Sequence, residues 1–161
     1  SMVFQHFGLV PHMSVLQNVA YGLRTKKIPK PERYQLAQHW LNKVGLEGVD
    51  NKYPDELSGG MQQRVGLARA LAVDTPIILM DEAFSALDPM IRGQLQDQLL
   101  TLQDKLNKTI LFITHDIDEA IKLGGMVSIL NGGRLIQTGT PQQLRDDPAD
   151  DYVARFMRTD G

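Results

Sequence analysis

The sequence predicts an α/β fold in which a parallel sheet follows a largely helical region. Two apolar runs of strand length, at residues 76–81 and 109–114, are separated by one long amphipathic stretch. Such a strand–helix–strand unit forms a right-handed crossover between parallel strands. Near-continuous apolar strands are typical of sheets that are covered on both faces. Residues 14–75 carry mostly helical periodicity instead.

Three helices are expected in this first region. Ser14 and Gln17 form a capping box, which predicts the start of a helix over residues 14–23. A second amphipathic helix ends at Gly45, because glycine is favoured just beyond a helix C-terminus. The third covers residues 59–73 and opens on two glycines.

The remaining elements alternate between helix and strand. Residues 89–106 form the long crossover helix, whose first residue, Pro89, suits a first turn. The later elements are a helix at 116–123, a hairpin with strands at 127–130 and 134–138, and short helices at 141–146 and 149–158. The apolar start of the sequence reads as a strand that begins abruptly, so we expect a cut inside a strand at Ser1.

Composition excludes several classes of function. The 161 residues are 42% hydrophobic and 22% charged, with a formal net charge of -2, which gives no electrostatic reason to expect nucleic acid as a partner. There is no cysteine, so disulfides, thiolate metal sites and a cysteine nucleophile are excluded. No apolar run approaches the roughly 18 residues that span a bilayer.

Two acidic residues and one histidine follow the predicted parallel strands. Asp81 and Glu82 end the first strand, and His115 follows the second. Because neighbouring parallel strands end about 5 Å apart at one edge of a sheet, these side chains are expected to lie close together. A carboxylate there suits Mg²⁺, and a second one can orient or deprotonate water. A solvated turn and a structural histidine remain alternatives.

A serine and two glycines open the third predicted helix, within the octapeptide at 57–64. The N–H groups at such a helix start, together with the helix dipole, favour an anionic ligand. A glycine-rich turn capped by Ser58 explains the glycines but not the whole octapeptide. Gln5 and Ser85–Asp88 do not by themselves indicate a function. A glutamine at a strand end is common, and Ser85–Asp88 could simply form a turn that caps the following helix.

In order along the chain, these residues resemble the motifs of the ABC ATPase family. The resemblance covers nearly the whole chain and implies a P-loop NTPase-like (RecA-like) parallel sheet, truncated, with an inserted ABC helical subdomain. It matches Gln5 to the Q-loop glutamine, Leu57–Gln63 to the signature motif, Ile77–Asp81 to the Walker B strand, Glu82 to the catalytic glutamate, Ser85–Asp88 to the D-loop and His115 to the switch histidine. Met61 differs from the family's usual signature sequence, LSGGQ, because here methionine follows the two glycines.

The resemblance also implies cofactors and roles. ATP and Mg²⁺ are the expected cofactors, with Glu82 and His115 catalytic and with Asp81 and Gln5 near the metal. The residues expected at the nucleotide are Gln5, Ser58, Gly59, Gly60, Gln62 and Asp88. The serine–diglycine group would reach ATP held by a second ATPase subunit in a head-to-tail dimer.

The amino-acid sequence of residues 53–61, 80–89 and 114–120 is most similar to that of the bacterial glycine betaine/L-proline importers. Glu82-Ala83-Phe84-Ser85 is the best discriminator. This resemblance implies an osmoprotectant importer ATPase at the cytoplasmic face of the membrane. Its partners would be integral membrane permease subunits and, indirectly, a solute-binding protein. The apolar loop that begins residues 7–23 would dock on the permease or, alternatively, pack into the core.

The sequence has no Gly-x-x-x-x-Gly-Lys-[Ser/Thr] loop and no Gly-Lys pair. That loop cradles the β- and γ-phosphates, and in the family it precedes the Q-loop glutamine. Carboxylates repel a tetra-anionic nucleotide, so we expect the chain alone to bind ATP weakly or not at all. We also expect exposed apolar surface and association through the incomplete sheet.

The expected organisation is a Q-loop region at 1–13, a helical subdomain at 14–75, the C-terminal part of the RecA-like core at 76–140 and C-terminal helices at 141–161. Two other functions remain open. One is a soluble ABC ATPase without a membrane partner, which the near-neutral charge and the lack of a coiled-coil insertion disfavour. The other is a non-hydrolysing module that completes another subunit's site, which the presence of both proposed catalytic residues disfavours.

Overall fold

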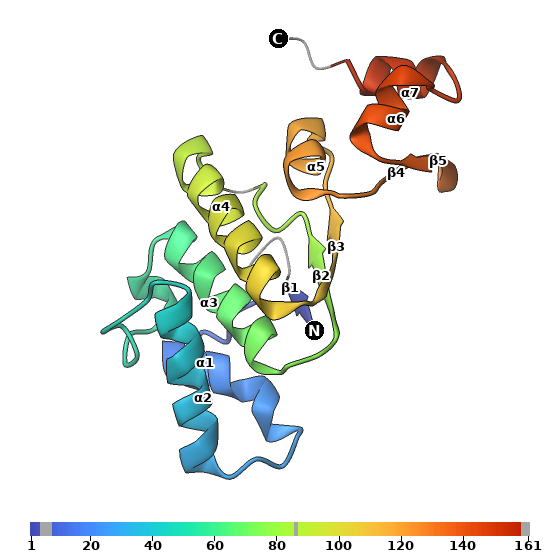
Figure 1. Cartoon of the computed structure of the whole chain (residues 1–161). Helices are drawn as coiled ribbons and strands as arrows, with labels where there is room; N and C mark the ends of the chain where they lie inside the picture. Colours follow the sequence, from blue (N-terminus) through green and yellow to red (C-terminus); the bar gives the residue numbers. More distant parts are fainter. Residues whose placement is uncertain (4–7, 86, 159–161) are drawn as a thin grey trace. The chain divides into compact units, whose positions relative to one another are not determined.

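The computed structural model describes residues 1–3, 8–85 and 87–158, and it confirms the expected α/β fold (Figure 1). The chain divides into two compact units, Ser1–Ile113 and Thr114–Gly161. The finer division expected at residues 13, 75 and 140 follows family motifs rather than compactness, and it stays a prediction.

The first unit contains the parallel sheet. Its strands are β1 (Met2–Val3), β2 (Ile77–Asp81) and β3 (Thr109–Ile113), in the order β1-β2-β3. Helix α4 (Pro89–Leu106) connects β2 to β3, which confirms the expected crossover. The side chain of Asp88 caps α4 by accepting a hydrogen bond from the Ile91 N–H at 3.0 Å. A carboxylate at this end also suits the helix dipole.

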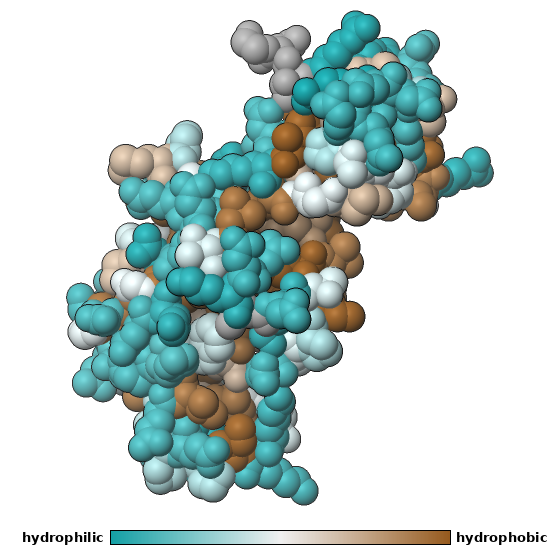
Figure 2. Space-filling view, in the orientation of Figure 1, coloured by the Kyte–Doolittle hydropathy of each residue, from teal (hydrophilic) through white to brown (hydrophobic). Residues whose placement is uncertain are grey.

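One face of this sheet is buried and the other is not. Val3, Ile78 and Met80 are each 1% exposed. The helices of the described first unit pack on the face of the sheet that carries these side chains (Figure 1). The side chains of the opposite face are between 36% and 55% exposed: Met2, Ile77, Leu79, Leu111 and Ile113. The prediction that these strands are covered on both faces is therefore wrong for this chain. In Figure 2, hydrophobic surface appears in the region where Figure 1 draws β2 and β3.

Three helices form the helical region of the first unit, as expected. They are α1 (Val15–Ala20), α2 (Lys30–Lys43) and α3 (Gly59–Ala72), with single 3₁₀ turns at Tyr21–Arg24 and Pro54–Glu56. The capping box of Ser14 and Gln17 is confirmed. The α-helix expected over residues 14–23 ends at Ala20, and the chain continues as a 3₁₀ turn. There Gly22 packs closely on Val73, and an added Cβ would lie 2.5 Å from Cγ2 of that valine.

A buried asparagine fixes the loop before α1. Asn18 is fully buried, and its Nδ2 donates to the carbonyl oxygens of Val10, Met13 and Ser14 at 3.0 to 3.1 Å. Its Oδ1 accepts from the Val10 N–H at 2.8 Å. Both ends of this amide are therefore satisfied by loop backbone, which is what allows a polar side chain to be buried without a large desolvation penalty.

The second unit has its own small core. It contains α5 (Ile117–Leu123), the antiparallel hairpin of β4 (Val127–Asn131) and β5 (Arg134–Gly139), α6 (Pro141–Asp146) and α7 (Asp151–Phe156). The core residues are Val127, Ile129, Leu144, Val153 and Met157. This agrees with the elements expected after residue 115. Across the described parts of both units, no helix combines the length and apolarity needed to cross a bilayer.

Candidate functional site

The acidic pair lies at the carboxyl end of β2, as expected. Asp81 is the last residue of the strand and pairs with Ile113 of β3, and the Glu82 N–H donates to the Ile113 carbonyl at 2.9 Å. Both acidic residues are half-buried. Glu82 has a left-handed backbone conformation, with a φ of 45°. Such a conformation is uncommon outside glycine, and strained residues of this kind cluster at functional sites.

The segment after Glu82 is a hydrogen-bonded turn. The N–H and Oγ of Ser85 donate to the Glu82 carbonyl at 3.2 and 3.0 Å, and the Leu87 N–H donates to the Phe84 carbonyl at 3.2 Å. Asp88 then caps α4. Capping thus accounts for the geometry of Asp88 without a ligand, and its expected role at the nucleotide stays a prediction. Ala86 lies outside the described residues.

The signature tip, defined here as Ser58, Gly59 and Gly60, opens helix α3. The Ser58 Oγ accepts from the Met61 N–H at 3.3 Å, so Ser58 is the N-cap. Ser58 and Gly59 are exposed and Gly60 is half-buried. The first N–H groups of a helix have no partner within the helix, so this tip presents donors to whatever approaches it.

Gln62 points back rather than outward. Its Nε2 donates to the Pro54 carbonyl at 2.9 Å and lies 3.4 Å from the Leu57 carbonyl oxygen. This side chain therefore stabilises the turn that leads into the signature tip. Its expected contact with nucleotide remains a prediction, and it would require these bonds to be exchanged.

Some of the expected site residues come together and others do not. The signature tip lies beside the start of α4: an added Cβ on Gly59 would be 3.9 Å from Cδ2 of Leu87, and one on Gly60 would be 2.6 Å from Cγ2 of Ile91. His115 belongs to the second unit, so its expected closeness to Glu82 stays a prediction. Gln5 lies outside the described residues.

The described residues do not contain a complete metal site. They hold no group of three or more histidine, cysteine or acidic side chains that could bind a metal ion. The half-buried carboxylate of Asp81 offers the hard oxygen ligand that Mg²⁺ prefers. This fits a shared site in which Asp81 supplies one ligand and phosphate oxygens supply others.

Two arginine contacts in this region were not anticipated from the sequence. Arg69, in the last turn of α3, donates from Nη1 to the Gly8 carbonyl at 2.7 Å, and burial lowers the pKa of its guanidinium. Arg92, in the first turn of α4, donates from Nη2 to the Leu87 carbonyl at 3.3 Å. Neither residue carries a local signal, because arginine is an ordinary residue on a helix.

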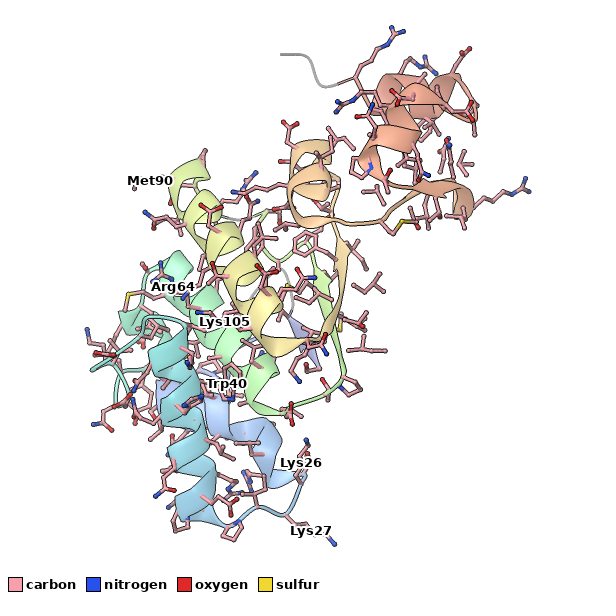
Figure 3. All side chains as sticks on the ribbon, in the orientation of Figure 1. Lys26, Lys27, Trp40, Arg64, Met90 and Lys105 are labelled. Atoms are coloured by element: carbon pink, nitrogen blue, oxygen red, sulfur yellow. The ribbon has the colours of Figure 1, made fainter. Side chains whose placement is uncertain are left out.

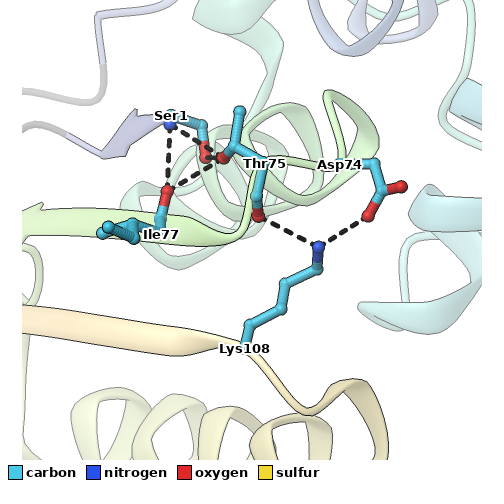
Figure 4. Close-up of polar contacts among 5 residues, drawn as sticks. All are labelled: Ser1, Asp74, Thr75, Ile77 and Lys108. Atoms are coloured by element: carbon cyan, nitrogen blue, oxygen red, sulfur yellow. Dashed lines mark hydrogen bonds and ion pairs between the residues drawn. The ribbon is translucent and has the colours of Figure 1, made fainter.

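The first unit is also fastened at the opposite end of the sheet (Figure 4). Lys108 donates to Asp74 at 2.6 Å and to the Thr75 carbonyl at 3.0 Å. The amino group of Ser1 donates to Oγ1 of Thr75 at 2.9 Å and to the Ile77 carbonyl at 3.2 Å. The hydrogen bond from Lys108, and then its charge, lower the pKa of the Asp74 carboxyl.

Comparison with known proteins decides the family. The sequence model of a family described as ABC transporter matches residues 1–85, which is more than half of the 161 residues. The chain belongs to the ABC transporter family. Its three parallel strands and crossover helix fit a truncated ABC, P-loop NTPase-type domain.

Individual relatives of this ABC transporter chain are close. It is 54% identical over 157 residues to the glycine betaine transport ATP-binding protein of Bacillus subtilis, covering 98% of this chain and 38% of that protein. It is 54% identical over 158 residues to the glycine betaine/proline betaine transport system ATP-binding protein of Escherichia coli, covering 98% and 40%. It is 55% identical over 157 residues to the glycine betaine/carnitine transport ATP-binding protein of Listeria monocytogenes, again covering 98% and 40%. The chain thus spans about two fifths of the length of these curated relatives.

Proposed function

We propose that this chain is part of the ATP-hydrolysing subunit of an ABC importer for glycine betaine or a similar small osmoprotectant, such as proline. The observation that supports the catalytic part is the left-handed Glu82 that directly follows Asp81 at the carboxyl end of β2. The solute class rests on the names of three relatives that are 54–55% identical.

The acidic pair divides the chemistry between two carboxylates. Asp81 would contribute an oxygen ligand to Mg²⁺, which would neutralise charge on the phosphates when bound. Glu82 would accept a proton from, or orient, the attacking water. Its hydrogen-bonded backbone holds the residue at the strand end, because the Glu82 N–H is bound to Ile113 and its carbonyl accepts from Ser85. His115 would donate a hydrogen bond to a phosphate or to the water.

The signature tip would act on a nucleotide held by a second subunit. Ser58 and Gly59 are exposed, and so is Asp88. An exposed helix start that presents N–H donors suits the phosphates of a ligand brought by another chain. We therefore propose a head-to-tail dimer in which each signature tip completes the partner's site, with Gln5 sensing the γ-phosphate and Mg²⁺.

The loop before α1 is the proposed contact to integral membrane permease subunits. Leu9, Val10 and Met13 are half-buried rather than fully packed, so each keeps apolar surface that a partner can cover. The position of this subunit would be the cytoplasmic face of the membrane, and a solute-binding protein would take part only through the permease.

The experiment joins this chain to the residues that precede the matched region in the Bacillus subtilis relative and compares the fusion with the chain alone. We expect steady ATP hydrolysis by the fusion, loss of at least about 100-fold in the Glu82→Gln fusion, and no turnover by the chain alone. Turnover by the pure chain that Glu82→Gln abolishes would contradict the proposed division of the site. A fusion that binds ATP but never hydrolyses it would favour a module that only completes another subunit's site.

The solute and the membrane partner need a separate test. The fusion is co-expressed with the permease and solute-binding subunits of the Bacillus subtilis system, and ATP-dependent uptake of labelled glycine betaine is measured in vesicles. We expect uptake that is lost with Glu82→Gln. ATP hydrolysis without association with any membrane subunit would favour the soluble ABC ATPase.

A further inference from the structure

One turn of helix α4 contacts two of the proposed functional elements. Ile91 and Arg92 are neighbours in the first turn of this helix, directly after the Asp88 cap. Ile91 packs on the signature tip, and Arg92 binds the backbone of the turn that follows Glu82. These two side chains therefore join segments that lie far apart in the sequence.

The contact of Ile91 with Gly60 is so close that any side chain at that glycine would have to displace the isoleucine or the backbone. A Cβ on Gly60 would lie 2.6 Å from Cγ2 and 3.8 Å from Cβ of Ile91. Because isoleucine is branched at Cβ and is stiff in a helix, its Cγ2 cannot easily move aside. At Gly59 an added Cβ would meet only Cδ2 of Leu87, at an ordinary 3.9 Å. The two glycines therefore have different roles, although the sequence presents them as equivalent.

Arg92 forms the second half of this connection. Its Nη2 donates to the Leu87 carbonyl at 3.3 Å and approaches the Ser85 carbonyl at 3.5 Å. Charged donors give the stronger hydrogen bonds to carbonyl groups. The carbonyl groups of Ser85 and Leu87 are thus bound by the same helical turn that packs on the signature tip.

We propose that Ile91 is a positioning residue: its Cγ2 methyl group sets the place of the signature tip relative to the turn at Ser85–Asp88. This inference rests on the proposed function for its consequence, which is that a second subunit meets both elements in a fixed relative geometry. The contact itself involves no nucleotide and can be tested without any.

The test uses two substitutions that separate shape from size. Ile91→Val keeps Cβ and both atoms attached to it, so it keeps the contact with Gly60 while losing one carbon. Ile91→Leu keeps the size of the side chain but has no Cγ2. A role in general hydrophobic burial would favour leucine over valine, whereas positioning through Cγ2 favours valine. Met90→Leu is the matched control, because Met90 neighbours Ile91 in the first turn of α4 but is 69% exposed (Figure 3).

The first measurement is the amide NMR spectrum of the chain. We expect Ile91→Leu to shift the signals of Ser58 to Met61, Ile91→Val to leave them nearly in place, and Met90→Leu to leave them unchanged. Equal shifts with valine and leucine at this position, or no shift with either, would overturn the proposal.

The second measurement is the midpoint temperature of thermal unfolding in a double-mutant series. It remains informative if one variant gives poor NMR spectra. Gly60→Ala should lower the midpoint by roughly 2–12 °C in the unaltered and Ile91→Val backgrounds, because its methyl group meets Cγ2. In the Ile91→Leu background the loss should be clearly smaller. The same loss in all three backgrounds would contradict the proposed contact. Neither measurement uses ATP, so failure here is distinct from failure of the fusion to hydrolyse ATP.

Discussion

Arg69 donates a hydrogen bond to the carbonyl of Gly8 at 2.7 Å, between residues that are 61 positions apart in the sequence. Arg69 lies in the last turn of α3, and the first turn of the same helix packs on Ile91. Helix α3 is therefore fastened at both ends. One end holds the chain that follows the proposed Q-loop glutamine, and the other holds the proposed D-loop through α4.

The first prediction concerns this arginine. Arg69→Met should lower the free energy of unfolding by about 0.5–1.5 kcal/mol, because it removes the donor to the Gly8 carbonyl, which is exposed and can then bind water. Hydrogen exchange at residues 8–10 should accelerate in this variant, and by more than exchange within helix α2. Urea unfolding and exchange measured by mass spectrometry provide the check. Arg69→Lys, which keeps the charge, should recover part of the loss, and a neutral effect of Arg69→Met would show that this contact does not hold the segment.

The second prediction follows from the left-handed backbone of Glu82. Glu82→Gly should be more stable than Glu82→Ala by roughly 0.5–1 kcal/mol, because relief of about 1–2 kcal/mol of backbone strain exceeds the added entropy cost of glycine. The comparison is matched, because both variants lack the carboxylate and only alanine keeps the Cβ. Thermal unfolding distinguishes the two. Equal effects of glycine and alanine would mean that the backbone at this position is not strained.

The third prediction is a dependence of stability on pH. The pKa of Asp74 is lowered in the folded chain by the hydrogen bond and charge of Lys108. A carboxyl with a lowered pKa stabilises the fold above its unfolded value, near 3.8, and this stabilisation is lost as the pH falls through the folded pKa.

The effect should be small and should weaken with salt, because the Asp74 side chain is exposed. Asp74→Asn should reduce stability slightly at pH 7 and flatten the acid limb of a plot of stability against pH. Asparagine also tolerates the positive φ of 52° at this position. An unchanged acid limb in this variant would assign the acid sensitivity to other carboxyl groups.

The fourth prediction concerns the uncovered face of the sheet. Met2, Leu79 and Leu111 pair across the three strands and form one apolar row on that face. Exposed contiguous apolar surface promotes association, so the chain should self-associate at high concentration and bind a fluorescent apolar dye.

Replacing Leu111 and Ile113 by threonine should reduce both effects, since threonine keeps β-propensity while lowering hydrophobicity. Met90→Thr, at a still more exposed apolar site on a helix, is the control and should change neither. Light scattering that shows a clean monomer of the unaltered chain at high concentration would contradict the expectation of association.

Local chemistry made most of the elements predictable. The capping box of Ser14 and Gln17 and the cap at Asp88 are signals that act within three or four residues, so both helix starts are readable from sequence. The acidic pair at the end of β2 follows from a strand of five residues that ends on a carboxylate. Such features need no knowledge of distant contacts.

What could not be predicted depends on residues that are remote in sequence. The sequence treats Gly59 and Gly60 alike, and only the position of Ile91 distinguishes them. The apolar strands likewise look the same whether or not a further layer covers them. For that reason the expectation of a sheet covered on both faces was wrong, although the strands themselves were right.

The buried amide of Asn18 has a consequence for how the loop before α1 meets a partner. Its bonds to Val10, Met13 and Ser14 give the loop one shape before any other surface arrives. The conformational entropy of this segment is therefore lost during folding rather than during association. A protein that docks on Leu9, Val10 and Met13 would meet a surface whose shape is already fixed. Its dissociation rate would therefore depend on how well its own surface complements that shape.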